Sequence, residues 1–159
     1  MILNKIADHA GSEEGASRAY RALANWCDIN NWIGSAKWFR GESREELDHC
    51  LAFEEYAIDR GQAVVVDGQK TLATMTSARL VDAFSAALEL ESKVMAELQS
   101  LSATAHKEGD YDAVRFLQKY LEIGTVSIKN LQVHVSWLER AGTDQAALQA
   151  FDRAIATGN

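Results

Sequence analysis

Glutamate residues interrupt the apolar stripes of three expected helices, where a helical bundle normally buries aliphatic side chains. Glu13 lies seven residues before Tyr20, so both side chains fall on one face of a helix. Glu46 and His49 have the spacing i, i+3, which also places them on one face. Glu91 stands in the middle of the apolar stripe of a third helix. Because a charged carboxylate in a core is costly unless a cation or a proton neutralises it, these residues predict a binding site.

A metal ion is the partner that suits these side chains best. No Lys or Arg occupies the neighbouring stripe positions. Hard carboxylate oxygens with one imidazole nitrogen favour iron, manganese or zinc. A single glutamate at the edge of a core often reaches solvent, and Glu-x-x-His alone occurs by chance, but three such stripes together favour a metal site. The other histidines, His9, His106 and His134, have no partner at ligand spacing.

Amphipathic helices must position these residues, since apolar side chains recur at every third and fourth position. The pattern predicts four long helices and a short fifth one, over residues 3–31, 32–60, 76 or 77–107, 111–141 and 144–156. Gly11 and Ser12 could interrupt the first helix, and Thr143 is the expected N-cap of the last. Short turns imply antiparallel pairs, so we expect an all-α fold in a single domain, residues 1–159.

A long crossover connects the second and third expected helices. Residues 61–76 break the helical pattern, and Ala63–Val66 predicts an extended segment with a short strand-like piece. Such a crossover returns the second pair of helices against the first.

Composition narrows the function classes. The chain has 159 residues, of which 47% are hydrophobic and 25% charged, as expected for a globular domain. Its 16 Lys and Arg residues are scattered among 23 Asp and Glu residues, so no basic stripe is available to bind nucleic acid. No apolar run approaches the roughly 20 residues of a membrane-spanning helix, which leaves a cytoplasmic protein as the default. Cys27 and Cys50 are expected to be buried, reduced thiols.

Several segments match one known family in both residue type and spacing. They are Glu13–Tyr20, Ala24–Cys27, Arg44–His49, Tyr56–Gly61, the segment around Glu91, Asp110–Tyr111 and Phe116–Gln118. Through them the chain resembles the ferritins, specifically the bacterial non-haem type, over essentially its whole length. The resemblance implies a ferritin-like four-helix bundle that assembles into a hollow cage of about two dozen subunits. It also implies oxidation of Fe2+ to Fe3+ by oxygen within each subunit and storage of the iron mineral inside the cage.

The resemblance gives roles to the residues on the interrupted stripes. Glu13 corresponds to the first-helix ligand of a first iron, and Glu46 to the carboxylate that bridges two irons. His49 corresponds to the imidazole ligand of the first iron, and Glu91 to the third-helix ligand of the second. Tyr20 matches the tyrosine that usually lies beside the centre. Glu46 and Tyr20 are thus the candidate catalytic residues.

The fourth expected helix departs from the family pattern. Where the family has Glu-Gln followed three residues later by Glu, this chain has Ile123-Gly124 and then Ser127. The second iron would keep Glu46 and Glu91 and lose its other ligands. Because two-electron reduction of oxygen needs two metals close together, we expect ferroxidase activity that is slow or depends on a competent partner subunit in a mixed cage.

Two alternatives stay open. Glu122 lies one residue, or about 100°, off the inner stripe and could substitute as a ligand, which would give a working oxidase. The chain could instead be a non-catalytic bundle that holds one redox-inert metal such as zinc or calcium, or that keeps its buried acids protonated. A haem is not expected, because Leu47 stands where the axial methionine of a bacterioferritin would be.

An acidic face follows the second expected helix beside the stripe of ligands. It carries Glu45, Asp48, Glu55 and Asp59. Such a face is either simply solvated or, as the resemblance implies, turned in part toward the cage interior, where clustered carboxylates would nucleate mineral. Glu45 also matches an acid of an accessory iron site, which should be weak or absent because the matching positions of the fourth helix carry no acids.

Overall fold

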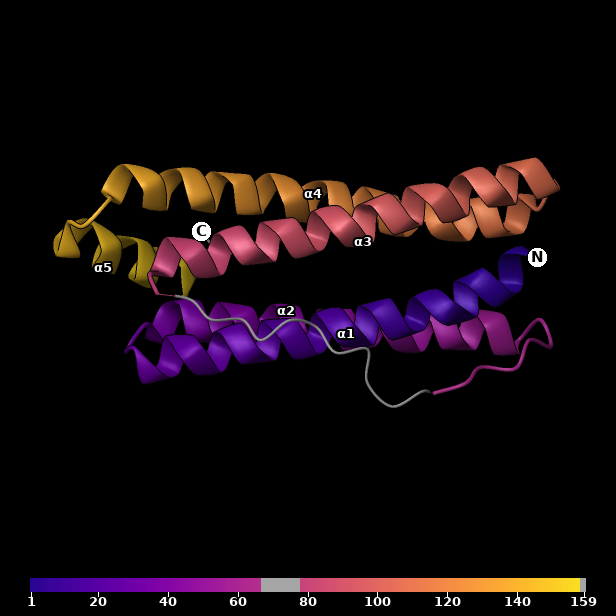
Figure 1. Cartoon of the computed structure of the whole chain (residues 1–159), viewed down its shortest axis with the longest axis horizontal. Helices are drawn as coiled ribbons and strands as arrows, with labels where there is room; N and C mark the ends of the chain where they lie inside the picture. Colours follow the sequence, from indigo (N-terminus) through magenta and orange to yellow (C-terminus); the bar gives the residue numbers. More distant parts are fainter. Residues whose placement is uncertain (67–77, 158–159) are drawn as a thin grey trace.

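Five helices form the described part of the chain, which covers residues 1–66 and 78–157 of a computed structural model. They are α1 (Ile2–Ile29), α2 (Ile33–Ile58), α3 (Leu80–Glu108), α4 (Tyr111–Ala141) and α5 (Gln145–Ile155). The long helices lie side by side as two pairs, α1 with α2 and α3 with α4, and α5 lies at one end (Figure 1). The predicted all-α bundle with a long connection between α2 and α3 is confirmed.

The interior of α1 and the start of α5 differ from the sequence-based expectations. Helix α1 continues through Gly11 and Ser12 without a break. The N-cap of α5 is Asp144 rather than Thr143. The Asp144 side chain accepts hydrogen bonds from two backbone N–H groups of the first turn, at 2.9 and 3.2 Å. A carboxylate in this position satisfies two N–H groups that lack partners within the helix, so it defines where α5 begins.

The expected strand-like piece of the crossover is not formed. Residues 62–66 adopt no regular secondary structure, and Val65 and Val66 are exposed. A β-rich sequence needs a second strand to pair with, and the described residues offer none. The expected start of the third helix at Thr76 or Ser77 lies outside the described residues, within which α3 begins at Leu80.

Two aromatic-rich cores hold the bundle together at its two ends. The core near α5 is built around Phe39, Phe84 and Phe151, and the other around Phe53 and Tyr120. On α2 and α3 the two cores are separated by the glutamates at positions 46 and 91. On α4 the ten positions between Tyr120 and Leu131 contribute no buried side chain. The middle of the bundle is therefore polar and open toward α4, while both ends are closed by apolar packing.

Asp152 of α5 caps the N-terminus of α2. The N-cap residue Trp32 makes no side-chain capping bond. Instead, the Asp152 carboxylate accepts hydrogen bonds from the backbone N–H groups of Gly34 at 3.0 Å and Ser35 at 2.8 Å, and from the Ser35 hydroxyl at 2.7 Å. An anion at a helix N-terminus is stabilised by the unpaired N–H groups and the helix dipole. The contact fixes α5 on α2 and closes this end of the bundle.

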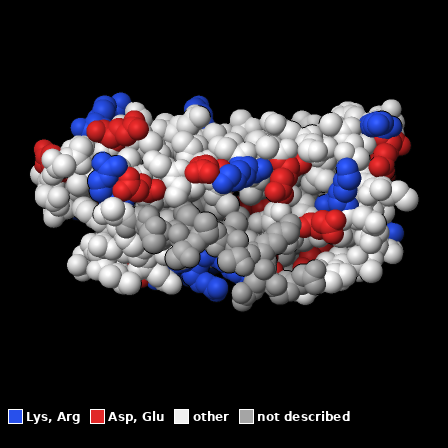
Figure 2. All heavy atoms as spheres, in the orientation of Figure 1, with Lys and Arg blue, Asp and Glu red and all other residues white. Residues whose placement is uncertain are grey.

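Charges of both signs are mixed on the surface. On the face in Figure 2, Lys and Arg side chains lie among Asp and Glu side chains, and no continuous basic stripe is visible. Among the described helices, none is both long enough and apolar enough to cross a membrane.

The close approach of α5 to α2 predicts an unequal response of two glycines to the same substitution. A Cβ at Gly34 would lie 1.8 Å from the backbone oxygen of Asp152, whereas a Cβ at Gly41 on the same helix meets no atom within 4 Å. We expect Gly34→Ala to lower the free energy of unfolding by about 1–3 kcal/mol. Gly41→Ala should raise it by about 0.5–1 kcal/mol, because alanine favours a helix interior. Urea denaturation of both variants measures the difference, and equal effects would contradict the described docking of α5.

Candidate metal centre

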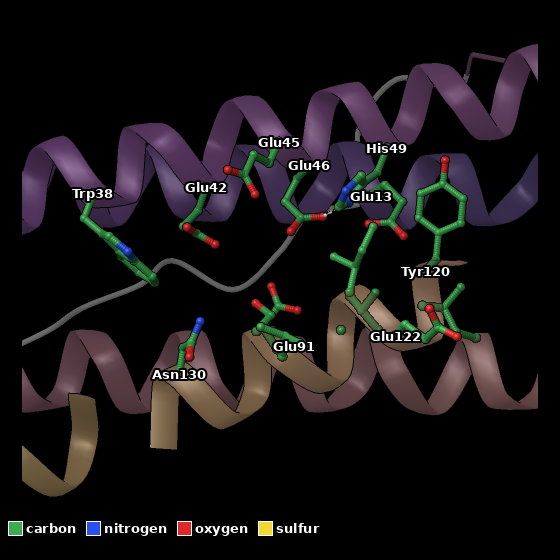
Figure 3. Close-up of a pocket in the computed structure, with 16 residues that line it drawn as sticks. Glu13, Trp38, Glu42, Glu45, Glu46, His49, Glu91, Tyr120, Glu122 and Asn130 are labelled. Atoms are coloured by element: carbon green, nitrogen blue, oxygen red, sulfur yellow. Dashed lines mark hydrogen bonds and ion pairs between the residues drawn. The ribbon is translucent and has the colours of Figure 1, made fainter. Parts of the chain in front are cut away.

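A cavity of about 510 Å³ lies in the polar middle of the bundle. Side chains of α2 face those of α3 and α4 across it (Figure 3). Its acidic and imidazole lining consists of six glutamates and one histidine: Glu13, Glu42, Glu45, Glu46, Glu91, Glu122 and His49. No Lys or Arg of the described residues lines the cavity. A site with this lining attracts cations and repels anions.

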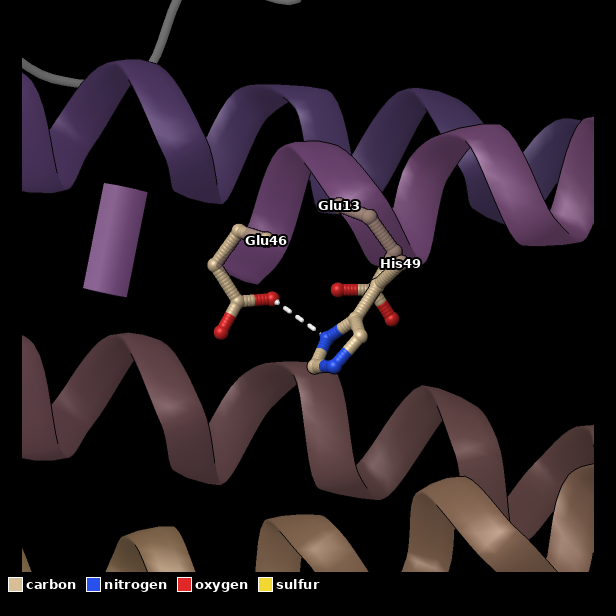
Figure 4. A group of neighbouring side chains, drawn as sticks. All are labelled: Glu13, Glu46 and His49. Atoms are coloured by element: carbon tan, nitrogen blue, oxygen red, sulfur yellow. Dashed lines mark hydrogen bonds and ion pairs between the residues drawn. The ribbon is translucent and has the colours of Figure 1, made fainter. Parts of the chain in front are cut away.

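Three of these side chains converge into one set of potential metal ligands (Figure 4). One ligand atom each from Glu13, Glu46 and His49 lies within 4.8 Å of the other two. Two ligands of one metal, each about 2.0–2.2 Å from it, lie at most about 4.4 Å apart, so small side-chain shifts suffice to close the site. Within the set, Glu46 Oε2 lies 3.2 Å from His49 Nδ1. Among the described residues, this is the one group of three or more such donors that lies close enough to hold a metal ion.

One oxygen of the Glu13 carboxylate is buried without a hydrogen-bond partner among the described residues. Glu13 is 2% exposed, and the oxygen without a partner is Oε2. A buried carboxylate oxygen without a partner costs free energy, because it has lost its water and gained nothing in return. A cation bound between Glu13, Glu46 and His49 would supply the missing interaction.

Burial and mutual repulsion alter the proton affinities of the centre. Burial raises the pKa of Glu46, and the nearby Glu13 raises it further, while the hydrogen bond to His49 opposes both effects. Burial also raises the pKa of Glu91, and the charge of Glu46 adds to this effect. For His49 burial lowers the pKa, but the hydrogen bond to Glu46 and the charges of the nearby glutamates together outweigh it, so the pKa is raised. Without a metal, protons therefore balance the charge, and a divalent cation must displace them.

Glu91 of α3 lines the same cavity but does not join the three-ligand set, and Tyr20 holds its carboxylate. The Tyr20 hydroxyl donates a hydrogen bond to Glu91 Oε1 at 2.5 Å, and both side chains are buried. Burial, followed by the charge of Glu91, raises the pKa of Tyr20 well above its ordinary value. Tyr20 is therefore a neutral hydrogen-bond donor that orients Glu91.

Helix α4 brings little ligand chemistry to the cavity. Ile123, Gly124 and Ser127 line it but offer no carboxylate or imidazole. A Cβ at Gly124 would lie 2.9 Å from Met95 Cε, so the methionine of α3 occupies the space beside this position. Glu122 is exposed and accepts a hydrogen bond from Gln118 Nε2 at 3.1 Å. It lines the cavity without joining the three-ligand set.

The acids expected to nucleate mineral occupy different surroundings. Glu45 is exposed and lines the cavity. Asp48, Glu55 and Asp59 are also exposed, but they do not line it. Together they form no ligand set comparable to that of the buried centre.

Two residues of the centre were not recognised as such from the sequence. Glu42 lies one turn before Glu46 and lines the cavity. Burial, with the charges of neighbouring glutamates, raises its pKa to about 8. The statement that His9 lacks a partner at ligand spacing is wrong, because His9 Nε2 lies 2.9 Å from Glu13 Oε1. The i, i+4 spacing of His9 and Glu13 was the available signal.

Comparison with known proteins places the chain in a family. The ferritin-like domain, Ferritin, matches residues 3–141, and the chain belongs to this family. It is 26% identical to the bacterial non-heme ferritin of Staphylococcus saprophyticus over 155 residues, which cover 98% of the chain and 92% of the relative. It is likewise 26% identical to that of Staphylococcus aureus strain MRSA252 over 156 residues, with 98% and 93% covered. The predicted membership of the ferritin family is confirmed.

Solved structures show the same fold. The structure of an open-pore ferritin from the archaeon Archaeoglobus fulgidus superposes with a TM-score of 0.93 at 22% sequence identity. The match covers 98% of this chain and 95% of that one. The predicted ferritin-like arrangement of the bundle and its fifth helix is thus confirmed.

The raised pKa of Glu42 predicts how stability varies with pH in the metal-free protein. A carboxyl whose pKa is higher in the folded state binds more protons there than in the unfolded chain. Its stabilising effect is complete below about pH 4.5 and is lost as the pH rises to about 8, so the free energy of unfolding should fall across this window. Glu42→Gln should flatten that fall, whereas the exposed Glu55→Gln should not. Thermal unfolding of metal-free protein between pH 5 and 8 measures the slopes, and a stability that rises with pH in wild type would contradict this prediction.

Proposed function

We propose that the chain is an iron-binding and iron-storing ferritin-like subunit, with one tight Fe2+ site formed by Glu13, Glu46 and His49. The observation that carries the proposal is the convergence of one ligand atom from each of these three residues, together with the unpartnered Oε2 of the buried Glu13. The acidic cavity, which no lysine or arginine of the described residues lines, supports a cation as the occupant. The names of the relatives, bacterial non-heme ferritins, support iron as the physiological metal.

The second metal position is weak in this proposal. From the described residues it would receive carboxylates of Glu46 and Glu91, with Tyr20 holding the latter. Helix α4 contributes no carboxylate or imidazole at Gly124 and Ser127, which line the same cavity. Since paired oxidation of Fe2+ by oxygen requires two irons close together, ferroxidation is slow in this chain alone or depends on a competent partner subunit.

Assembly into a hollow cage follows from the same proposal. The full-length similarity to ferritins supports it, because storage needs an enclosed interior as well as a binding site. Glu45, Asp48 and Glu55 on α2 would offer exposed carboxylates to iron, as a solvated acidic face can. Cage subunits of this chain could be mixed with ferritin subunits that carry an intact fourth-helix ligand set. No haem is part of the proposal.

A redox-inert metal is the second candidate occupant. Two carboxylates and one imidazole also suit Zn2+, and three protein ligands with an open fourth position are typical of zinc sites. In that case the chain would be a non-catalytic metal-binding bundle. Metal analysis after iron loading in air separates the two functions, because storage gives many irons per subunit and an inert site gives about one metal ion.

Anaerobic Fe2+ titration tests the tight site. Wild type should bind one Fe2+ per subunit tightly, and Glu46→Gln should abolish this phase, because it removes the central carboxylate of the set. Glu122→Gln is the matched control on α4, and it should leave the tight phase unchanged because Glu122 lies outside the set. Loss of binding in the control alone would show that α4 supplies the ligand after all.

Oxygen kinetics test the missing fourth-helix ligands. Stopped-flow mixing of the Fe2+-loaded wild type with oxygen should show a slow phase without a rapid burst of two irons per subunit. Ser127→Glu should raise both the tight Fe2+ stoichiometry and the oxidation rate, because it restores a carboxylate that faces Glu46 and Glu91 across the cavity. A fast, two-iron burst in wild type would contradict the proposed weakness of the second position.

A further inference from the structure

His9 lies next to Glu13 of the candidate metal centre, at a point where α1, α2 and α3 meet. The side chain is 3% exposed and touches a polar or aromatic group from each helix. On α1, Nε2 lies 2.9 Å from Glu13 Oε1. On α3, Nδ1 lies 3.1 Å from Glu97 Oε2. On α2, the ring packs against Phe53 with 4.9 Å between centroids. These three contacts leave the imidazole a single orientation.

Both ring nitrogens of His9 face carboxylates, so the ring can act as a hydrogen-bond donor on both sides. An ionised carboxylate only accepts hydrogen bonds, so each contact is satisfied when the facing nitrogen carries a proton. Nε2–H then donates to Glu13 Oε1 and Nδ1–H to Glu97 Oε2. The Glu97 side chain is 54% exposed, so the chain of contacts runs from the surface to the ligand.

The two oxygens of Glu13 are therefore not equivalent. Oε1 lies within hydrogen-bond distance of His9 Nε2. Oε2 has no hydrogen-bond partner among the described residues. Glu13 is also one of the three residues of the ligand set. A glutamate on a helix has several rotamers, and fixing one oxygen from behind selects the rotamer that presents the other. Hydrogen bonds of this kind behind a metal ligand orient it and strengthen binding.

We propose that His9 is a positioning residue of the metal centre: it holds Oε1 of Glu13, so that Oε2 is the single oxygen offered to the cation, and Glu97 anchors the ring from the surface. This inference rests on the metal site of the proposed function, which it deepens. It does not depend on whether the bound iron is oxidised or stored.

A surface cavity of about 270 Å³ lies on the outer side of His9, between α1 and α3. Lys5, Asp8 and Ser12 of α1 line it together with His9 and Glu97. The contact between His9 and Glu97 can therefore be altered from the surface, with little change to the packed core. This makes Glu97 a second, less disruptive position at which to test the same proposal.

Titration with Co2+ tests the proposal, because this ion takes carboxylate and imidazole ligands and reports binding through its visible absorption. His9→Leu keeps the apolar packing against Phe53 and removes the donor to Glu13. It should weaken Co2+ binding about 10- to 100-fold. His9→Gln should recover much of the affinity, because its amide N–H can donate to a glutamate four residues on. Glu97→Leu should weaken binding by less than His9→Leu.

A double-mutant cycle separates positioning from packing. If His9 acts through Glu13, adding His9→Leu to Glu13→Ala should cause no further loss of Co2+ affinity. A full additional loss in that background overturns the proposal, since it assigns the effect to packing. Unchanged Co2+ affinity in both His9→Leu and Glu97→Leu overturns it as well.

The outcomes also separate this inference from the proposed function. Wild type that binds Co2+ tightly but neither oxidises nor stores iron would contradict the proposed function alone, and the cycle would still decide the role of His9. Wild type that takes up no Co2+ overturns both. Should His9→Leu unfold, judged by circular dichroism, the same cycle with Glu97→Leu, alone and added to Glu13→Ala, gives the same decision.

Discussion

The structure depends on the neutralisation of carboxylates that are buried with no lysine or arginine of the described residues beside them. Glu13, Glu46 and Glu91 are each at least 94% buried. Bare charges in such surroundings would repel one another and would lack the solvation that water gives. Two histidines lie against them, and protons or a cation must supply the rest of the positive charge. Binding of a divalent ion is the solution that uses the unpartnered oxygen of Glu13 as well.

The rest of the bundle is arranged so that this polar centre can exist. Aromatic cores at both ends, around Phe39 and Phe53, fix the helices, so the middle does not need to be apolar. The stretch of α4 between Tyr120 and Leu131 leaves room for a cavity instead of closing on the glutamates. The stability of the ends and the proposed cation binding of the middle are thus separate properties of one fold.

Features encoded within one helix could be predicted from local spacing, and the joining of Glu13 with Glu46 and His49 across helices could be predicted only through the family resemblance. Periodicity defined the helices, and the i, i+3 spacing paired Glu46 with His49, because helix geometry alone fixes both. The contact of His9 with Glu97 joins residues 88 positions apart, so no local pattern reveals it. The strand-like piece predicted in the valine-rich crossover is not formed, because strand propensity needs a partner strand to take effect.

Anomalous diffraction at the iron edge, from crystals soaked anaerobically in Fe2+, tests the central claim most directly. One strong peak per subunit is expected between Glu13, Glu46 and His49, with Oε2 as the Glu13 ligand and weak or no density beside Glu91. A centre that remains without iron after soaking, or two equally strong peaks with ligands from α4, would contradict the account.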